Sequence, residues 1–101
     1  MAMTFKVLKL QQAQREFEGL SEKQKELVSA DYRTIETKGI EFVKRRYLRN
    51  GIFEIKSDDV RSLFKYQEDR IILIGLIYEK RSRKAPQDIL KLAEKRLKEN
   101  K

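Results

Sequence analysis

The chain has 101 residues, of which 40% are hydrophobic and 40% are charged, and its formal net charge is +8. This length fits one domain spanning residues 1–101, and the apolar share is enough for one modest core. Because the sequence contains neither cysteine nor histidine, it excludes disulfides, the usual zinc-ligand sets and imidazole acid–base catalysis. No apolar run approaches the roughly 20 residues needed to cross a bilayer and no export signal is recognisable, so we expect a cytoplasmic protein without a membrane partner.

The positive charge is concentrated in the middle of the chain. Residues 44–84 hold twelve basic and six acidic residues, whereas residues 1–43 hold seven of each. An excess of cations confined to one segment favours a polyanionic partner, which means RNA, DNA or an acidic protein.

The first half of the chain predicts one strand and two helices. Residues 4–10 (TFKVLKL) are rich in β-branched and aromatic residues, which is typical of a strand. Residues 11–20 predict a short helix, and Ser21 with Gln24 has the form of a capping box that begins a second one. Gly39 is a suitable C-terminal cap for that second helix. We expect the two helices to run antiparallel and to pack on one face of a sheet.

The second half predicts three strands and a final helix. Segments with strand character and short polar turns between them cover residues 52–56, 60–66 and 70–78, and the near-continuous apolar run of the last one indicates the centre of the sheet. Residues 42–49, which contain KRRYLR, match no clear period. A basic loop then leads to Pro86, which suits the first turn of an amphipathic helix. The order of elements predicts an α+β domain whose three consecutive strands form an antiparallel meander.

The cations of the second half are predicted to converge on one face of this sheet. Alternation places Glu54 and Lys56 on one side of their strand, and Arg61 and Lys65 on one side of the next. Taken singly, such residues are more often solvated, so only their convergence would make a site. The cations that would join Lys56 and Arg61 are Lys80, Arg81, Arg83 and Lys84 from the basic loop, with Arg45, Arg46 and Arg49 as a rim.

A cationic sheet face of this kind suits bound phosphates and, with them, RNA cleavage. Attack of a 2′-oxygen on the adjacent phosphorus builds negative charge that positioned Arg and Lys side chains stabilise. Such a reaction requires no metal, and the acidic pairs Asp58-Asp59 and Glu68-Asp69 are predicted to be turn residues. Tyr47, Tyr66 and Tyr78 are candidates for stacking on bases, although tyrosines in such positions more often lie at the core boundary.

Three motifs between residues 50 and 100 resemble the RelE/ParE superfamily, and most closely its HigB-like, phage-derived branch. The run GIFEIK ends at Lys56. It resembles a strand motif of that branch, which is glycine, an aromatic or aliphatic residue, any residue, glutamate, an apolar residue and a basic residue in that order. Val60-Arg61 with Phe64 and Tyr66 resembles its next strand. The run YEKRSRKAP, ending at Pro86, resembles its basic motif before the last helix, with alanine in place of the usual threonine before the proline.

The resemblance implies a RelE-like microbial ribonuclease fold, with an N-terminal strand and helix pair packed on an antiparallel sheet and a C-terminal helix. It implies the toxin of a type II toxin–antitoxin system, an mRNA interferase that cuts mRNA on the ribosome without a cofactor. It also implies a cognate helix-turn-helix antitoxin of the HigA-like kind. Basic family positions coincide with Lys56, Arg61, Lys80 and Arg81, which are therefore the predicted catalytic residues, and Lys84 is the next choice. The general base stays unassigned.

Two other functions remain open at this point. A ParE-like toxin would inhibit DNA gyrase and cleave nothing, although such chains generally lack the full set of cations on the sheet. A non-catalytic RNA- or ribosome-binding module would bind in a salt-sensitive manner without turnover.

Overall fold

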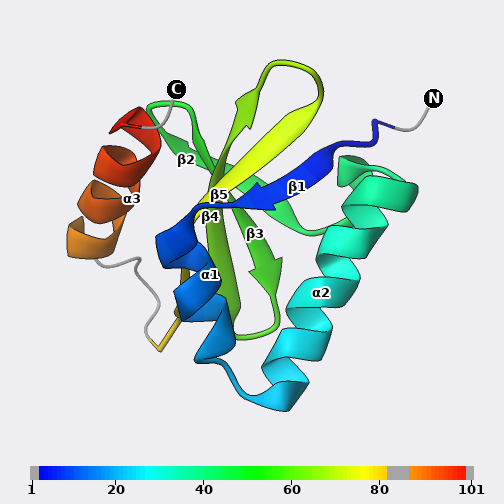
Figure 1. Ribbon diagram of the computed structural model, residues 1–101, viewed down its shortest axis with the longest axis horizontal. Coiled ribbons are helices and arrows are strands. Elements are labelled where there is room, and N and C mark those ends of the chain that lie inside the picture. The colour runs from blue at the N-terminus through cyan, green and yellow to red at the C-terminus, as the bar shows by residue number, and fades with distance from the viewer. Residues whose placement is uncertain (1–2, 82–86, 100–101) are drawn as a thin grey trace.

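A computed structural model describes residues 3–81 and 87–99 (Figure 1). Its elements follow the predicted α+β order, with one added strand and a short 3₁₀ helix. They are β1 (Lys6–Lys9), α1 (Gln11–Glu18), α2 (Glu22–Thr37), η1 (Ile40–Phe42), β2 (Arg45–Arg49), β3 (Ile52–Ser57), β4 (Val60–Gln67), β5 (Ile71–Glu79) and α3 (Gln87–Glu99). Among these residues, no helix is long and apolar enough to span a membrane.

The local signals of the sequence are found where they were predicted. The Ser21 hydroxyl accepts a hydrogen bond from the Gln24 amide, and the Ser21 amide donates to the Gln24 side chain, so the capping box at the start of α2 is confirmed. α1 and α2 run in opposite directions (Figure 1). Asn50 and Gly51 both have positive φ, 51° and 76°, as a tight type I′ hairpin requires. The predicted helix start at Pro86 lies outside the described residues.

The five strands form one sheet in the order β1-β5-β4-β3-β2. β3, β4 and β5 form the predicted antiparallel meander, and the unassigned KRRYLR segment forms β2, an antiparallel strand at the edge. The sheet is not antiparallel throughout, because β1 pairs with β5 in parallel. These two strands are separated by most of the chain, so no turn constrains their relative direction.

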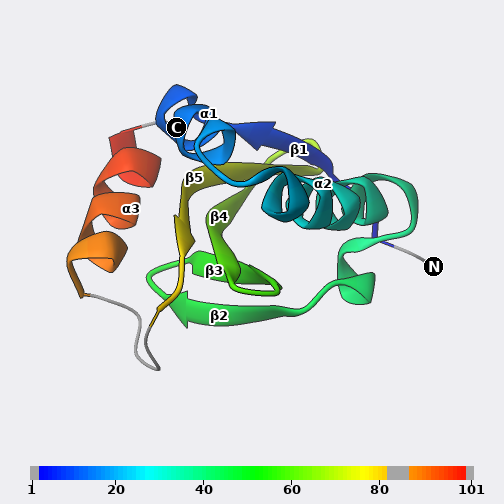
Figure 2. The same ribbon diagram turned by 90° about the horizontal axis from the view of Figure 1, so that it is seen from below.

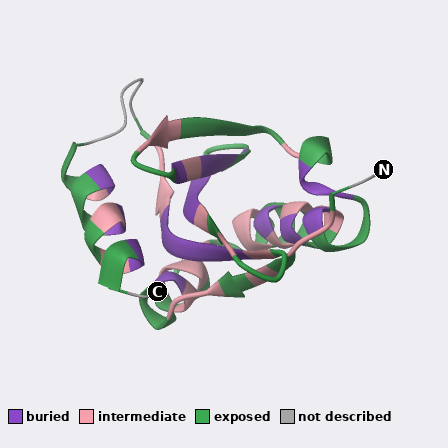
Figure 3. Ribbon diagram, turned by 90° about the horizontal axis from the view of Figure 1, so that it is seen from above, coloured by how far each residue is buried: buried purple, intermediate pink, exposed green. Residues whose placement is uncertain are grey.

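The sheet is covered on both faces. Helices α1 and α2 pack on one face and form a first core with Ile55, Phe64 and Ile74. α3 packs on the other face and forms a second core with Leu63, Leu73 and Leu76. In Figure 2 α3 lies on the opposite side of β4 and β5 from α2, and Figure 3 shows the buried segments between them. The face of β4 that carries Arg61 and Lys65 is therefore not purely basic, because Leu63 between them is fully buried beneath α3.

Candidate functional site

The site begins with a row of three residues that crosses three strands. Lys56 on β3 pairs with Arg61 on β4, and Arg61 pairs with Tyr78 on β5. Residues that lie directly opposite each other in an antiparallel ladder project from the same face. Lys80 follows just after β5, where its backbone amide donates to the Asp59 carbonyl at 2.7 Å. The register thus places Lys80 beside the row, next to the β3–β4 turn.

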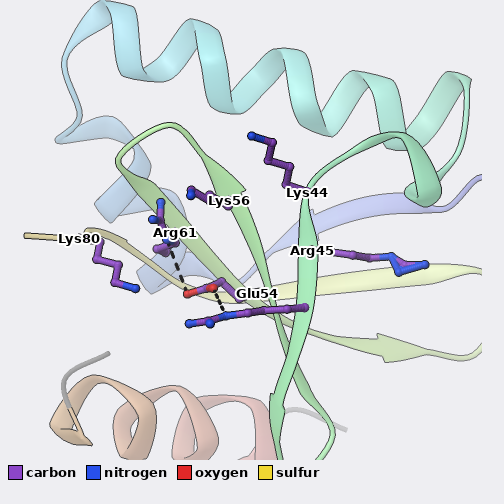
Figure 4. A pocket seen from close by; sticks show the side chains of 7 residues that line it. Lys44, Arg45, Glu54, Lys56, Arg61 and Lys80 are labelled. Carbon is purple, nitrogen blue, oxygen red and sulfur yellow. Dashed lines mark hydrogen bonds and ion pairs between the residues drawn. The ribbon is translucent and has the colours of Figure 1, made fainter. Parts of the chain in front are cut away.

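Lys56 and Arg61 of this row line a pocket of about 220 Å³ at the edge of the sheet. Six cations and one carboxylate line it (Figure 4), namely Lys44, Arg45, Arg46, Lys56, Arg61, Lys80 and Glu54. A concave surface with such an excess of positive charge focuses its field on an anion that enters it. Within the described ranges, no three acidic residues gather in a way that would hold a metal ion.

Glu54 lies at the centre of the pocket and is only 3% exposed. Its Oε2 accepts a hydrogen bond from Arg46 Nε at 2.8 Å, and its Oε1 lies 3.8 Å from Arg61 Nε (Figure 4). Burying a carboxylate is costly unless cations compensate for its lost hydration, which these two guanidinium groups do. Oε1 has no hydrogen-bond partner among the described residues. Within that part of the chain, Oε1 is therefore held by the charge of Arg61 alone and keeps its capacity to accept a hydrogen bond.

Arg61 is held rigidly at the back of the pocket. The residue is 7% exposed, and its guanidinium donates to the Asp58 carbonyl at 2.6 Å and to its neighbour Val60 at 3.2 Å. Asp58 has a φ of 56° in the tight β3–β4 turn, next to the strand that carries Arg61. A guanidinium fixed in this way can receive a phosphate oxygen without further loss of side-chain freedom.

Tyr78 supplies a second unpaired polar group. Its hydroxyl is buried and has no hydrogen-bond partner among the described residues. Desolvation, with a smaller contribution from the Glu54 charge, raises the pKa of the Tyr78 phenol above its ordinary value. The phenol is therefore a neutral hydrogen-bond donor at physiological pH.

Five of the predicted cations line this pocket, namely Arg45, Arg46, Lys56, Arg61 and Lys80. They do not all point inward, because the Arg45 side chain extends away from the others (Figure 4). Arg83 and Lys84 lie outside the described residues.

Two other predicted cations are engaged elsewhere. Arg81 pairs with Glu79, and its side chain is 84% exposed. Arg49 pairs with Glu94 of α3 and donates to Gln87 at 3.1 Å, so it holds β2 to the C-terminal helix. Neither is among the residues that line the pocket.

Three members of the site were not among the predicted site residues. Lys44 precedes β2 and could not be placed while that strand was unassigned. Glu54 was recognisable from its alternation with Lys56 and from its motif. Tyr78 was named only as a candidate for stacking on bases, and its position opposite Arg61 depended on the β4–β5 register, which no local pattern reveals.

Comparisons with known proteins agree with this architecture. Residues 15–98 match the family described as phage-derived protein Gp49-like (DUF891), and no curated protein matches the chain. The fold is similar to a structure of the archaeal RelE–RelB complex from Pyrococcus horikoshii OT3, with a TM-score of 0.65, 17% identity and coverage of 81% of this chain and 100% of that one. It is also similar to the toxin–antitoxin complex RelBE2 from Mycobacterium tuberculosis, with a TM-score of 0.58, 15% identity and coverage of 79% and 95%.

Proposed function

The chain belongs to the phage-derived Gp49-like family and has the fold of the RelE superfamily, and on that premise we propose that it is a toxin that cuts mRNA on the ribosome. It acts in the cytoplasm as a metal-independent endoribonuclease, and a cognate antitoxin of the HigA-like, helix-turn-helix kind neutralises it. The observation that carries the proposal is a pocket in which cations surround one buried carboxylate, whose Oε1 accepts no hydrogen bond from the described residues.

The pocket can accept the phosphate that undergoes cleavage. In this proposal Arg61, Lys56 and Lys80, which line the pocket, contact its oxygens, where negative charge grows in the transition state. Charged donors that are already oriented stabilise such charge without reorganisation, and removing one typically costs on the order of 10²–10³ in rate.

Glu54 is our candidate for the unassigned general base. Its Oε1, which accepts no hydrogen bond from the described residues, removes the proton from the 2′-hydroxyl, whose oxygen then bonds to the phosphorus. The bond from phosphorus to the 5′-oxygen breaks, and Lys80 is the candidate to protonate that leaving oxygen. The Tyr78 hydroxyl donates a hydrogen bond to the developing anion. The products are a 2′,3′-cyclic phosphate and a 5′-hydroxyl.

The same carboxylate argues against a purely RNA-binding module. A pocket built only to bind phosphate would gain affinity by excluding a buried anion, because like charges at close range repel. A buried carboxylate beside the phosphate site is explained by proton transfer. No feature of the pocket specifically favours a ParE-like action on DNA gyrase.

The test is to add the purified chain to a translating cell-free system and to map mRNA 5′ ends. We expect codon-phased cuts with the parent chain and with Arg15→Ala, a control at an exposed position of α1. We expect Arg61→Ala to slow cutting by about 10²-fold or more, and Glu54→Gln to slow it by about 10²–10⁴-fold. Intact mRNA with the parent, in an assay where a known ribosome-dependent nuclease cuts, would overturn the proposal, and gyrase supercoiling would be assayed next.

A further inference from the structure

The edge strand β2 presents functional side chains on both of its faces. Arg46 turns toward the pocket and reaches Glu54. Its neighbour Arg45 extends in the other direction (Figure 4). Tyr47 lies opposite Phe53 and contacts its ring, and Phe53 packs against the core that α1 and α2 cover. Tyr47 therefore also lies on the face of the sheet away from the pocket. Arg45 and Tyr47 are two residues apart in the strand and share that face.

The ring of Tyr47 is exposed yet firmly supported. The residue is 57% exposed, and its ring packs edge-on against Phe53 with centroids 5.2 Å apart at 70°. Its hydroxyl accepts a hydrogen bond from the Gly51 amide at 3.3 Å. Phe53 in turn stacks on the fully buried Phe64 at 5.7 Å. The ring therefore loses little freedom when a flat partner covers its open face.

We propose that Arg45 and Tyr47 form a second nucleotide subsite, which binds RNA that flanks the scissile phosphate. One base stacks on Tyr47, and the phosphate attached to that nucleotide meets Arg45. This inference rests on the proposed function, because the same RNA strand occupies the pocket and passes around β2.

Continuity and charge favour RNA as the occupant. Arg45 and Arg46 are adjacent in the chain. RNA that leaves the pocket at Arg46 therefore reaches Arg45 by passing around β2, the edge of the sheet, on which no further β-strand pairs. β2 reads RRYLR, with three arginines and no acidic residue. An acidic peptide would satisfy the arginines but would leave the exposed face of Tyr47 unused, whereas every base has a π-face that stacks on an aromatic ring.

The test combines protein variants with mRNAs that carry one abasic nucleotide. Ribosomes are programmed with mRNAs in which each position within a few nucleotides of the cut is made abasic in turn, and single-turnover cleavage is measured. With the parent chain, we expect one flanking abasic position to slow cleavage by about 5- to 150-fold, the value of one base stacked on an aromatic side chain. Tyr47→Ala should slow cleavage of the intact mRNA by a similar factor, and the same abasic position should then have no further effect.

Three controls separate stacking from folding and from the pocket. Tyr47→Phe keeps the ring and should retain the parent's sensitivity to that abasic position, whereas Tyr47→Leu keeps apolar packing on Phe53 and should behave like Tyr47→Ala. Leu92→Ala removes a side chain of similar exposure, 42%, from α3 and should change nothing. If the parent cuts mRNA but each abasic position slows cleavage by Tyr47→Ala as much as it slows cleavage by the parent, the subsite is refuted. The proposed function of the pocket is then unaffected. That result together with weaker antitoxin binding would make this face a protein contact. If the parent does not cut at all, the proposed function fails and the subsite fails with it.

Discussion

Replacing Gly75 with alanine tests how closely α3 packs on the sheet. An added Cβ would lie 2.6 Å from Leu97 Cγ and 2.7 Å from its Cδ2, well inside the roughly 3.5 Å at which carbon atoms attract. Leu97 is 2% exposed, so its side chain has no free space into which to turn. α3 is also tied to α1, because Arg96 donates to both oxygens of Glu16 at 3.0 Å. The clash must therefore shift the helix or strain the side chain.

The expected cost follows from two opposing terms. Overpacking a well-filled core costs about 1–3 kcal/mol. Gly75 does not have a positive φ, so alanine also restricts the unfolded chain and returns about 0.4–1 kcal/mol. We expect a net loss of about 1–2 kcal/mol, which lowers the melting temperature of a domain this size by about 4–16 °C.

Gly19→Ala is the matched control for this substitution. Its Cβ would lie 3.6 and 3.8 Å from backbone oxygens of α1, which are ordinary contacts, so that variant should melt at or slightly above the parent. Thermal and urea denaturation of both variants measure the difference. Leu97→Ala alone should cost about 2–5 kcal/mol, and its combination with Gly75→Ala should cost at least about 0.5 kcal/mol less than the two losses added together. A Gly75→Ala protein that melts at or above the parent would show that α3 does not pack against Gly75 as described.

Two further predictions concern the pocket. Glu54→Gln leaves the buried Arg61 without its carboxylate, so we expect urea denaturation to give a free energy of unfolding about 3 kcal/mol lower than the parent's. Glu68→Gln, in an exposed turn, is the control and should leave the urea midpoint unchanged. Equal midpoints for Glu54→Gln and the parent would contradict the pairing of Glu54 with Arg61. Desolvation raises the pKa of Tyr78. Subtracting the ultraviolet titration of Tyr78→Phe from that of the parent should therefore show the Tyr78 phenol ionising above pH 10. A midpoint of that difference curve at or below pH 10 would contradict the burial of Tyr78. The stability that the neutral phenol contributes is present below the unfolded pKa of about 10 and is lost as the pH rises through the higher folded value.

Much of the fold could be read from neighbouring residues. The capping box at Ser21, the Asn50-Gly51 turn and the apolar run of β5 each predict their element, because helix caps, tight turns and buried strands depend on side chains a few positions apart. The excess of cations in residues 44–84 likewise indicated the segment that supplies the six cations lining the pocket.

The assembly of the site depended on contacts between distant segments. Arg45, Arg46 and Arg49 look alike in the sequence, yet one extends away from the pocket, one holds Glu54 and one is tied to α3. No local pattern separates them, because the orientation of each follows from where β2 pairs and what packs against it.

The sequence by itself determined the α+β class, most element boundaries and the cationic character of the surface. Only the tertiary structure decided that β1 lies parallel to β5, that both sheet faces are covered and that Glu54 is enclosed by arginines. The reason is physical: propensity and periodicity act over one or two turns of chain, whereas register and burial are settled by packing between residues far apart in the sequence.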